Sequence, residues 1–178
     1  VGLIAFPRGR RRPARDPGPL PERTRTLVIL PTYNERATIA TVLDGLAATG
    51  ADLDVLVVDD GSPDGTGRIV RERSETDPHV RLVERSGKSG LASAYAVGFE
   101  RAISEGYDRV VEMDSDLSHR PDELPRLLEA ATRHHLVIGS RYVHGGSVAN
   151  WSRSRVALSK AGNLYARFCL GFDVHDAT

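Results

Sequence analysis

The stretch that decides the fold is VLVVDDGSPDGT, residues 55–66. Its first four residues form a continuous apolar run, which is typical of a short strand buried on both faces of a sheet. The acidic turn that follows contains the residues that favour tight turns, and it leads into a helical pattern around residues 68–75. A buried strand that runs into a polar turn and then a helix predicts an α/β fold with a parallel sheet.

The same alternation of strand and helix recurs on both sides of this stretch. Further strands are expected at residues 27–30, 80–84, 108–113 and 136–138, and helices from Ile39 to near Gly50 and over residues 89–105, 121–131 and 156–170. The regular alternation implies a Rossmann-like, mostly parallel sheet with helices on both faces. Ligands of such sheets bind beyond the carboxyl ends of the strands.

Length and composition fit one globular domain. The chain has 178 residues, of which 40% are hydrophobic and 27% charged, so it can bury a core. The sequence contains no run of about 18–20 apolar residues of the kind that crosses a bilayer. Its single cysteine excludes a disulfide framework and a cysteine-based zinc site.

The zero net charge hides an asymmetry. Residues 1–25 hold seven of the 24 basic residues, two of the 24 acidic ones and five of the ten prolines. This composition predicts a disordered basic tail with a charge of +5, which is either a solvated leader or weakly attracted to anionic lipid. Residues 26–178 then carry −5, and this acidic balance argues against a nucleic-acid partner.

Polar clusters follow the expected strands at residues 31–35, 59–66, 114–119 and 139–142. On a parallel sheet these clusters meet at one edge, and carboxylates gathered there repel one another unless a cation joins them. Asp114 and Asp116 are two residues apart, so they face the same side of a regular strand. They predict a Mg²⁺ or Mn²⁺ site that also takes a diphosphate, although an Asp-Ser-Asp turn alone is more often structural.

The remaining polar residues allow narrower interpretations. Asp60 is a candidate to hydrogen-bond a base or ribose, and Tyr33 either stacks on a base or is an ordinary half-buried aromatic. Turn and helix-cap roles suffice for Ser62, Pro63, Gly65 and Thr66. Residues 87–89 read Gly-Lys-Ser, but a phosphate-binding P-loop needs a glycine at position 82, which is leucine.

Taken together, the motifs resemble the family 2 glycosyltransferases of the GT-A fold, and specifically the dolichol-phosphate (polyprenol-phosphate) mannosyltransferases. The resemblance runs from about Leu27 to the last residue. It is carried by residues 31–36, 58–66, 88–95, 113–121 and 139–151 in this order.

This resemblance implies a role for particular residues in binding the donor. The residues that would hold the guanosine part of GDP-mannose are Pro31, Tyr33, Glu35, Val58 and Asp60. Asp114 and Asp116 would bind the Mg²⁺ or Mn²⁺ ion that bridges the diphosphate, with Ser118 as a further ligand and Ser115 lining the nucleotide.

The resemblance also implies an acceptor site. Arg141 would contact the reacting phosphates, and Arg155 and Ser159 would hold the phosphate of a polyprenyl monophosphate. Asp116 and Arg141 are the two residues expected to be catalytic. The implied reaction is inverting transfer of mannose from GDP-mannose to this lipid, at the cytoplasmic face of a membrane. A membrane-anchoring subunit or domain is left open as a further partner.

The sequence departs from the family pattern at two places. Ala92 replaces a glycine in the segment Lys-Ser-Gly-Leu-Ala of residues 88–92. The chain also ends at Thr178 where the family continues, so we expect the GT-A domain of residues 26–178 to be truncated at its C-terminus. Three alternatives stay open: a UDP-sugar donor, a catalytically incomplete nucleotide-sugar-binding fragment, and a phospho-acceptor signalling domain. The last one leaves residues 31–35 and Asp114 and Asp116 unexplained.

Overall fold

The structure is a computed structural model that describes residues 24–139. Strands and helices alternate along this part of the chain. In chain order they are β1 (Thr26–Thr32), α1 (Ile39–Ala48), β2 (Leu53–Asp59), α2 (Thr66–Thr76), β3 (Val80–Glu84), α3 (Leu91–Ser104), β4 (Arg109–Glu112), the short 3₁₀ turn η1 (Pro121–Glu123) and α4 (Leu124–Ala130).

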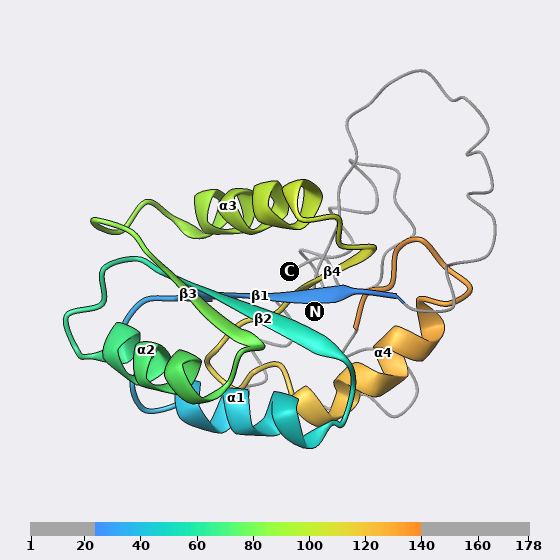
Figure 1. Cartoon of the computed structure of the whole chain (residues 1–178), viewed down its shortest axis with the longest axis horizontal. Helices are drawn as coiled ribbons and strands as arrows, with labels where there is room; N and C mark the ends of the chain where they lie inside the picture. The colour runs from blue at the N-terminus through green and yellow to red at the C-terminus, as the bar shows by residue number, and fades with distance from the viewer. Residues whose placement is uncertain (1–23, 140–178) are drawn as a thin grey trace, which may run out of the picture. The chain divides into compact units, whose positions relative to one another are not determined.

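The four strands form one parallel sheet in the order β3-β2-β1-β4. Helix α3 covers one face of the sheet, and α1, α2 and α4 lie on the other face (Figure 1). Thr32, the last residue of β1, pairs with Asp59, the last of β2, and Asp59 pairs with Glu84 at the end of β3. This arrangement confirms the predicted α/β class, the parallel sheet and the helices on both faces.

Each face of the sheet has its own hydrophobic core, because side chains alternate between the two faces along a strand. Val28 and Leu30 of β1 pack toward Leu43 and Leu46 of α1. The intervening Leu27 and Ile29 belong to the cluster on the side of α3. All of β1 is therefore buried except Pro31, which explains its continuous apolar sequence.

Helix α3 packs closely on β1 through a glycine. A Cβ atom added to Gly98 would lie 2.4 Å from Cδ1 of Ile29, so only glycine allows this separation. Gly98 is itself buried within the helix. The helix is accordingly held against the sheet by backbone-to-side-chain contact at its middle.

One predicted strand is wrong. Residues 136–138 have no strand structure, and Leu136 is 40% exposed. Within residues 24–139, β4 is paired with β1 alone, so no further strand lies beside it. A run of three apolar residues is too short to distinguish a strand from a partly covered loop.

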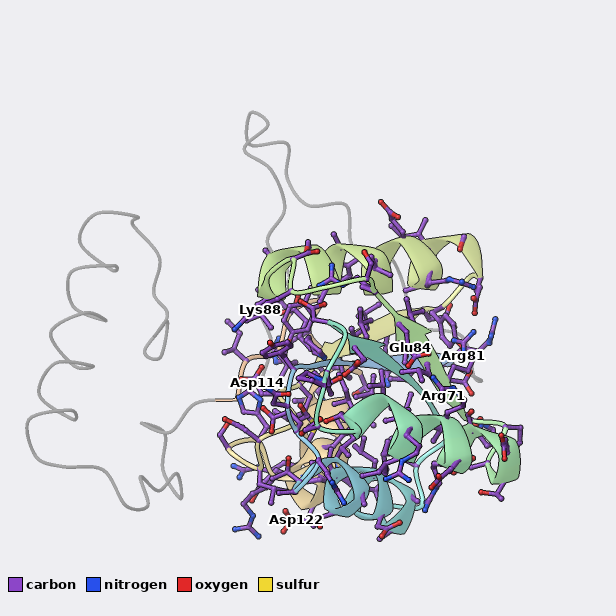
Figure 2. The ribbon with its side chains drawn as sticks, turned by 90° about the vertical axis from the view of Figure 1, so that its left-hand side faces the viewer. Arg71, Arg81, Glu84, Lys88, Asp114 and Asp122 are labelled. Carbon is purple, nitrogen blue, oxygen red and sulfur yellow. The ribbon has the colours of Figure 1, made fainter. Side chains whose placement is uncertain are left out.

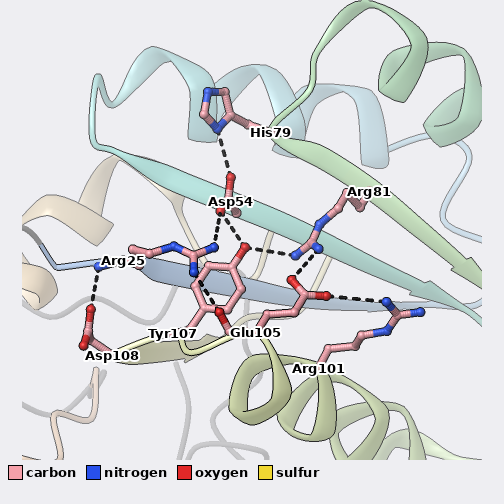
Figure 3. A network of polar contacts seen from close by, with 8 residues as sticks. All are labelled: Arg25, Asp54, His79, Arg81, Arg101, Glu105, Tyr107 and Asp108. Atoms are coloured by element: carbon pink, nitrogen blue, oxygen red, sulfur yellow. Dashed lines mark hydrogen bonds and ion pairs between the residues drawn. The ribbon is translucent and has the colours of Figure 1, made fainter.

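A network of polar contacts lies at the amino-terminal edge of the sheet, where the strands begin (Figure 3). The hydroxyl of Tyr107 donates to Asp54 over 2.5 Å, and His79 Nδ1 lies 2.9 Å from the same carboxylate. The guanidinium of Arg25 lies 4.3 Å from the centre of the Tyr107 ring. These contacts join the starts of β1, β2, β3 and β4 to one another.

Candidate nucleotide-binding site

The loops that follow the four strands are joined at the carboxyl edge of the sheet. The Asp60 amide donates to the carbonyl of Thr32 over 3.0 Å, and the Arg85 amide donates to the carbonyl of Asp59 over 2.8 Å. The hydroxyl of Ser115, which follows β4, donates to the carbonyl of Pro31 over 3.0 Å. The structure therefore brings the predicted clusters after β1, β2 and β4 to one edge.

The loop after β1 is fastened to the turn after β2. Three successive amides of residues 34–36 donate to side chains of this turn: Asn34 to Ser62, Glu35 to Thr66 and Arg36 to Asp64, over 2.9–3.0 Å. Asn34 has a φ of 63°, which turns the chain so that the three amides point to the turn. These contacts support the structural interpretation of Ser62 and Thr66.

The buried side chain of Asp59 stabilises this turn through hydrogen bonds. Its side chain is almost fully buried and accepts hydrogen bonds from the hydroxyl of Thr32 (2.8 Å) and from the amide (2.9 Å) and hydroxyl (2.6 Å) of Ser62. A buried carboxylate with several donors is well satisfied. Asp59 is therefore committed to the fold.

Asp60 has a different environment. Its carboxylate accepts a hydrogen bond of 2.5 Å from Nε of Arg85 and one of 3.1 Å from the amide of Ser89. The side chain is only 8% exposed. Arg85 was not predicted from the sequence, because an arginine at the end of a strand is more often a solvated charge, and its partner lies 25 residues away.

The neighbouring glycine allows the two loops to meet. Gly61 has a φ of +70°, and a Cβ atom there would lie 3.1 Å from the carbonyl oxygen of Arg85 and 3.4 Å from the backbone of Gly87. Only glycine combines this conformation with this close approach. The turn after β2 therefore lies directly against the lysine loop, residues 86–90.

Tyr33 and Lys88 meet at the same edge. The aromatic side chain is 38% exposed, and Nζ of Lys88 lies 4.6 Å from the centre of its ring. A cation over an aromatic face is an attractive contact. The exposed ring can also stack on a planar ligand.

The other residues predicted to hold the nucleoside differ in accessibility. Pro31 and Glu35 are partly buried, and the Glu35 carboxylate accepts a hydrogen bond from Thr38 over 3.0 Å. Val58 has a fully buried side chain in the core beneath α3. Its side chain is thus committed to packing and offers no surface to a ligand.

The acidic loop, residues 113–119 after β4, combines buried anchors with exposed carboxylates. Met113 and Ser115 are buried, whereas the side chain of Asp114 is 43% exposed and Asp116 and Ser118 are exposed. In Figure 2, Asp114 and Lys88 lie on one side of the molecule and Arg71, Arg81 and Glu84 on the other. Met113 and Ser115 therefore anchor this loop, whereas the alternating Asp114 and Asp116 face solvent.

His119 fixes the backbone of the acidic loop. Its Nδ1 accepts a hydrogen bond of 2.9 Å from the amide of Asp114. The same nitrogen lies 3.7 Å from the Asp114 carboxylate. The histidine thus has a structural role in the loop.

Two titrating groups of the site have shifted pKa values. Burial raises the pKa of Tyr95 above its ordinary range, and the charges of Asp114 and Glu112 add to this, so its hydroxyl stays protonated and points to Asp114 at 3.4 Å. Burial also raises the pKa of Asp116, but hydrogen bonds from the side chain and the amide of Ser118 outweigh it, and the pKa is lowered. Asp116 is therefore ionised at neutral pH.

The acidic loop fits a hard divalent cation. Within residues 24–139 no three His, Cys, Asp or Glu side chains gather around a common point. Mg²⁺ and Mn²⁺ need no such set, since Mg²⁺ usually takes one or two carboxylates together with water and substrate phosphates. Asp116 accepts hydrogen bonds only from Ser118 among the other described residues, the amide one over 2.9 Å, and a carboxylate has about four acceptor positions.

Some predicted features lie outside the described residues. These are most of the basic tail of residues 1–25, the helix of residues 156–170, and the site residues Arg141, Arg155 and Ser159.

The fold and the position of the site define the class of protein: this is a GT-A glycosyltransferase domain. Residues 27–178 match the family model described as glycosyl transferase family 2, and the chain belongs to this family.

Named relatives are similar over most of the chain. It is 47% identical to the polyprenol monophosphomannose synthase of Mycolicibacterium smegmatis, covering 92% of this chain and 62% of that protein. It is 49% identical to the undecaprenyl-phosphate mannosyltransferase of Micrococcus luteus, covering 86% of this chain and 63% of that protein. The chain therefore spans less than two thirds of the length of these two relatives.

A solved structure shares the fold. It is a mannosyltransferase from Pyrobaculum calidifontis in complex with GDP-Man and Mn²⁺. The TM-score is 0.54 at 34% identity, over 65% of this chain and 35% of that one.

Proposed function

We propose that this protein transfers mannose from GDP-mannose to a polyprenyl monophosphate, with inversion at the sugar carbon. The observation that carries the proposal is the acidic loop after β4, anchored through Ser115 to the end of β1 beside Tyr33 and Asp60. Two relatives, at 47% and 49% identity, are named for mannosyl transfer involving polyprenyl phosphates.

In this proposal the nucleoside binds at the ends of β1 and β2. Tyr33 offers an exposed ring for the base, and Asp60 has acceptor capacity left for a hydroxyl or an amino group. Pro31 and Glu35 line the same place. For Val58 only a main-chain contact is compatible with its burial.

Asp114 and Asp116 would hold Mg²⁺ or Mn²⁺, with Ser118 beside them and Ser115 lining the nucleotide. When bound, such an ion acts as a Lewis acid on the diphosphate and stabilises the charge that develops on GDP. The Mn²⁺ in the Pyrobaculum calidifontis complex supports a divalent ion of this kind. The protein's own part is to hold the two carboxylates in place through Ser115 and His119.

The bond changes require little acid–base chemistry. An oxygen of the lipid phosphate forms a bond to the anomeric carbon, and the bond from that carbon to the β-phosphate of GDP breaks with its electron pair. The products are GDP and polyprenyl phosphate mannose. Since the acceptor is an anion with a second pKa near 6, no strong base is needed. Arg141, Arg155 and Ser159 remain predicted contacts to the phosphates.

A lipid acceptor places the enzyme at a membrane surface, and we propose a peripheral location on the cytoplasmic face. No helix within residues 24–139 has the length and apolar character to span a bilayer.

The test is mannosyl transfer from labelled GDP-mannose to polyprenyl monophosphate in phospholipid vesicles, with Mn²⁺ or Mg²⁺. We expect labelled lipid from wild type and a loss of at least about a hundredfold in Asp116→Ala, the loss typical of removing one contact to developing charge. Asp122→Ala is the matched control, because Asp122 is an exposed carboxylate of η1 that pairs with the preceding Arg120.

Three outcomes would contradict the proposal. Near-normal transfer by Asp116→Ala would remove the metal assignment. Transfer from UDP-glucose in preference to GDP-mannose would change the donor. Binding of GDP-mannose without transfer would favour a nucleotide-sugar-binding fragment.

A further inference from the structure

Arg85 is the first residue after β3, and its side chain is directed into the candidate site. The guanidinium is 14% exposed, and the Asp60 carboxylate that it contacts is 8% exposed. Both Nε, at 2.5 Å, and Nη2 approach the same oxygen of Asp60. Two opposite charges this far from solvent fix each other's position strongly, because separating them would leave a poorly solvated charge.

The remaining nitrogen atoms of Arg85 hold the lysine loop and the start of α3. Nη1 donates to the hydroxyl of Ser93 over 2.7 Å, and Nη2 donates to the carbonyl of Gly90 over 3.3 Å. The Ser89 amide donates to the second oxygen of Asp60 over 3.1 Å. The side chains of Arg85 and Asp60 therefore hold the end of the lysine loop and the start of α3, directly after Lys88.

This arrangement links the two groups that would contact a nucleoside. Asp60 carries the carboxylate, and the lysine loop places Lys88 against the exposed ring of Tyr33. Neither the backbone of the lysine loop nor the direction of the Asp60 side chain is fixed by a helix or strand. The planar, forked guanidinium makes both contacts at once, which a lysine ammonium cannot do.

We propose that Arg85 is a positioning residue for the nucleoside of the donor. It acts through Asp60 and the lysine loop and touches neither the sugar nor the reacting phosphates. The inference rests on the proposed function. It adds that one side chain, Arg85, keeps the nucleoside-binding end of the site ordered.

The experiment measures binding of GDP with Mn²⁺ by calorimetry, and KM and kcat for GDP-mannose, in the full chain. We expect Arg85→Lys and Arg85→Gln to weaken GDP binding and raise KM by about tenfold or more, with kcat changed less than about twofold, because the lost interaction is uniform between ground and transition states. Ser93→Ala, which removes one of the arginine's partners, should have a smaller effect in the same direction.

The controls separate positioning from general damage. Arg71→Gln removes an exposed arginine paired with Glu84 and should leave KM unchanged. A double-mutant cycle with Asp60→Asn should be strongly non-additive, since Arg85 acts through Asp60. Thermal melting checks folding, and Arg85→Lys or Ser93→Ala carries the test if Arg85→Gln does not fold.

Unchanged GDP affinity in the Arg85 variants, a fall in kcat at constant KM, or additive effects with Asp60→Asn would each overturn the inference. Failure of the proposed function looks different, because it shows in wild type itself, which would then transfer no mannose and, at the nucleoside site, bind no GDP. In that case the inference falls together with the function.

Discussion

Asp59 and Asp60 are adjacent carboxylates at the end of β2, yet they have different surroundings. Asp59 points inward and accepts hydrogen bonds from Thr32 and Ser62, whereas Asp60 faces Arg85 and Ser89. The alternation of side chains along an extended backbone separates them. The sequence motif predicted a functional role for Asp60, and the structure provides the reason why Asp59 is needed for the fold.

We therefore predict that Asp59→Ala destabilises the protein by about 1–3 kcal/mol, the cost of leaving buried donors unpaired. The measurement is the free energy of unfolding in urea. The exposed Asp122→Ala should change it by no more than about 0.5 kcal/mol. Equal stability of the two variants would contradict the structural role of Asp59.

A second prediction concerns His79 and Asp54 at the opposite edge. The hydrogen bond to Asp54 raises the pKa of His79 above its ordinary 6.5. Burial raises the pKa of Asp54, but hydrogen bonds from Tyr107 and His79 outweigh it and the pKa lies below 3.8. The contact therefore stabilises the fold most between pH 3.8 and 6.5. It is lost as pH rises through the raised His79 value, and again as pH falls through the lowered Asp54 value.

NMR titration of the His79 ring checks this directly. In Asp54→Asn the pKa of His79 should move down toward its ordinary value. Asp52→Asn removes only a weaker charge contact and should cause a much smaller change. A His79 titration that is the same in wild type and Asp54→Asn would contradict the contact.

At the scale of elements, the close packing of α3 on β1 predicts that alanine at position 98 lowers the stability of the protein. Helix propensity alone predicts the opposite. Alanine in place of a helical glycine is ordinarily favourable by about 1 kcal/mol. At position 98 its Cβ would meet Ile29 at 2.4 Å, so we expect Gly98→Ala to destabilise by about 1–3 kcal/mol, as overpacking does.

Chemical denaturation of Gly98→Ala gives the sign. In an Ile29→Ala background, where the obstructing side chain is gone, the same substitution should no longer destabilise the protein. Stabilisation of the otherwise unchanged protein by Gly98→Ala would show that α3 lies farther from the sheet.

The elements that sequence predicted well are those whose signal is local. The apolar runs at residues 27–30 and 55–58 lie within β1 and β2, because strands buried on both faces have continuous apolar sequence. The edge strand β3 occupies the predicted residues 80–84. Residues 136–138 carried the same signal over only three positions, which did not determine a strand. Pro121 begins a 3₁₀ turn, and α4 starts three residues later.

The candidate site was predictable only where a motif occupied one loop. The acidic loop after β4 and the turn after β2 could be placed at one edge from topology alone. Arg85 and Lys88 could not be assigned, because their contacts with Asp60 and Tyr33 join residues far apart in the chain. Packing against Leu27 and Ile29 likewise decides that the Val58 side chain is buried.

At the scale of the whole described domain, the two edges of the sheet have different chemistry. The amino-terminal edge is a closed network in which Arg25, Asp54 and Tyr107 satisfy one another (Figure 3). The carboxyl edge instead presents the exposed ring of Tyr33 and the exposed carboxylates of the acidic loop. A ligand therefore finds accessible polar groups at the carboxyl edge.

We propose above all that the acidic loop binds a divalent cation and a sugar-linked diphosphate together. Calorimetric titration of GDP-mannose into the full chain, with and without Mn²⁺, measures this most directly. We expect saturable binding that requires the metal ion in wild type and is lost in Asp116→Asn. Binding that is independent of Mn²⁺, or equally tight in Asp116→Asn, would contradict this proposal.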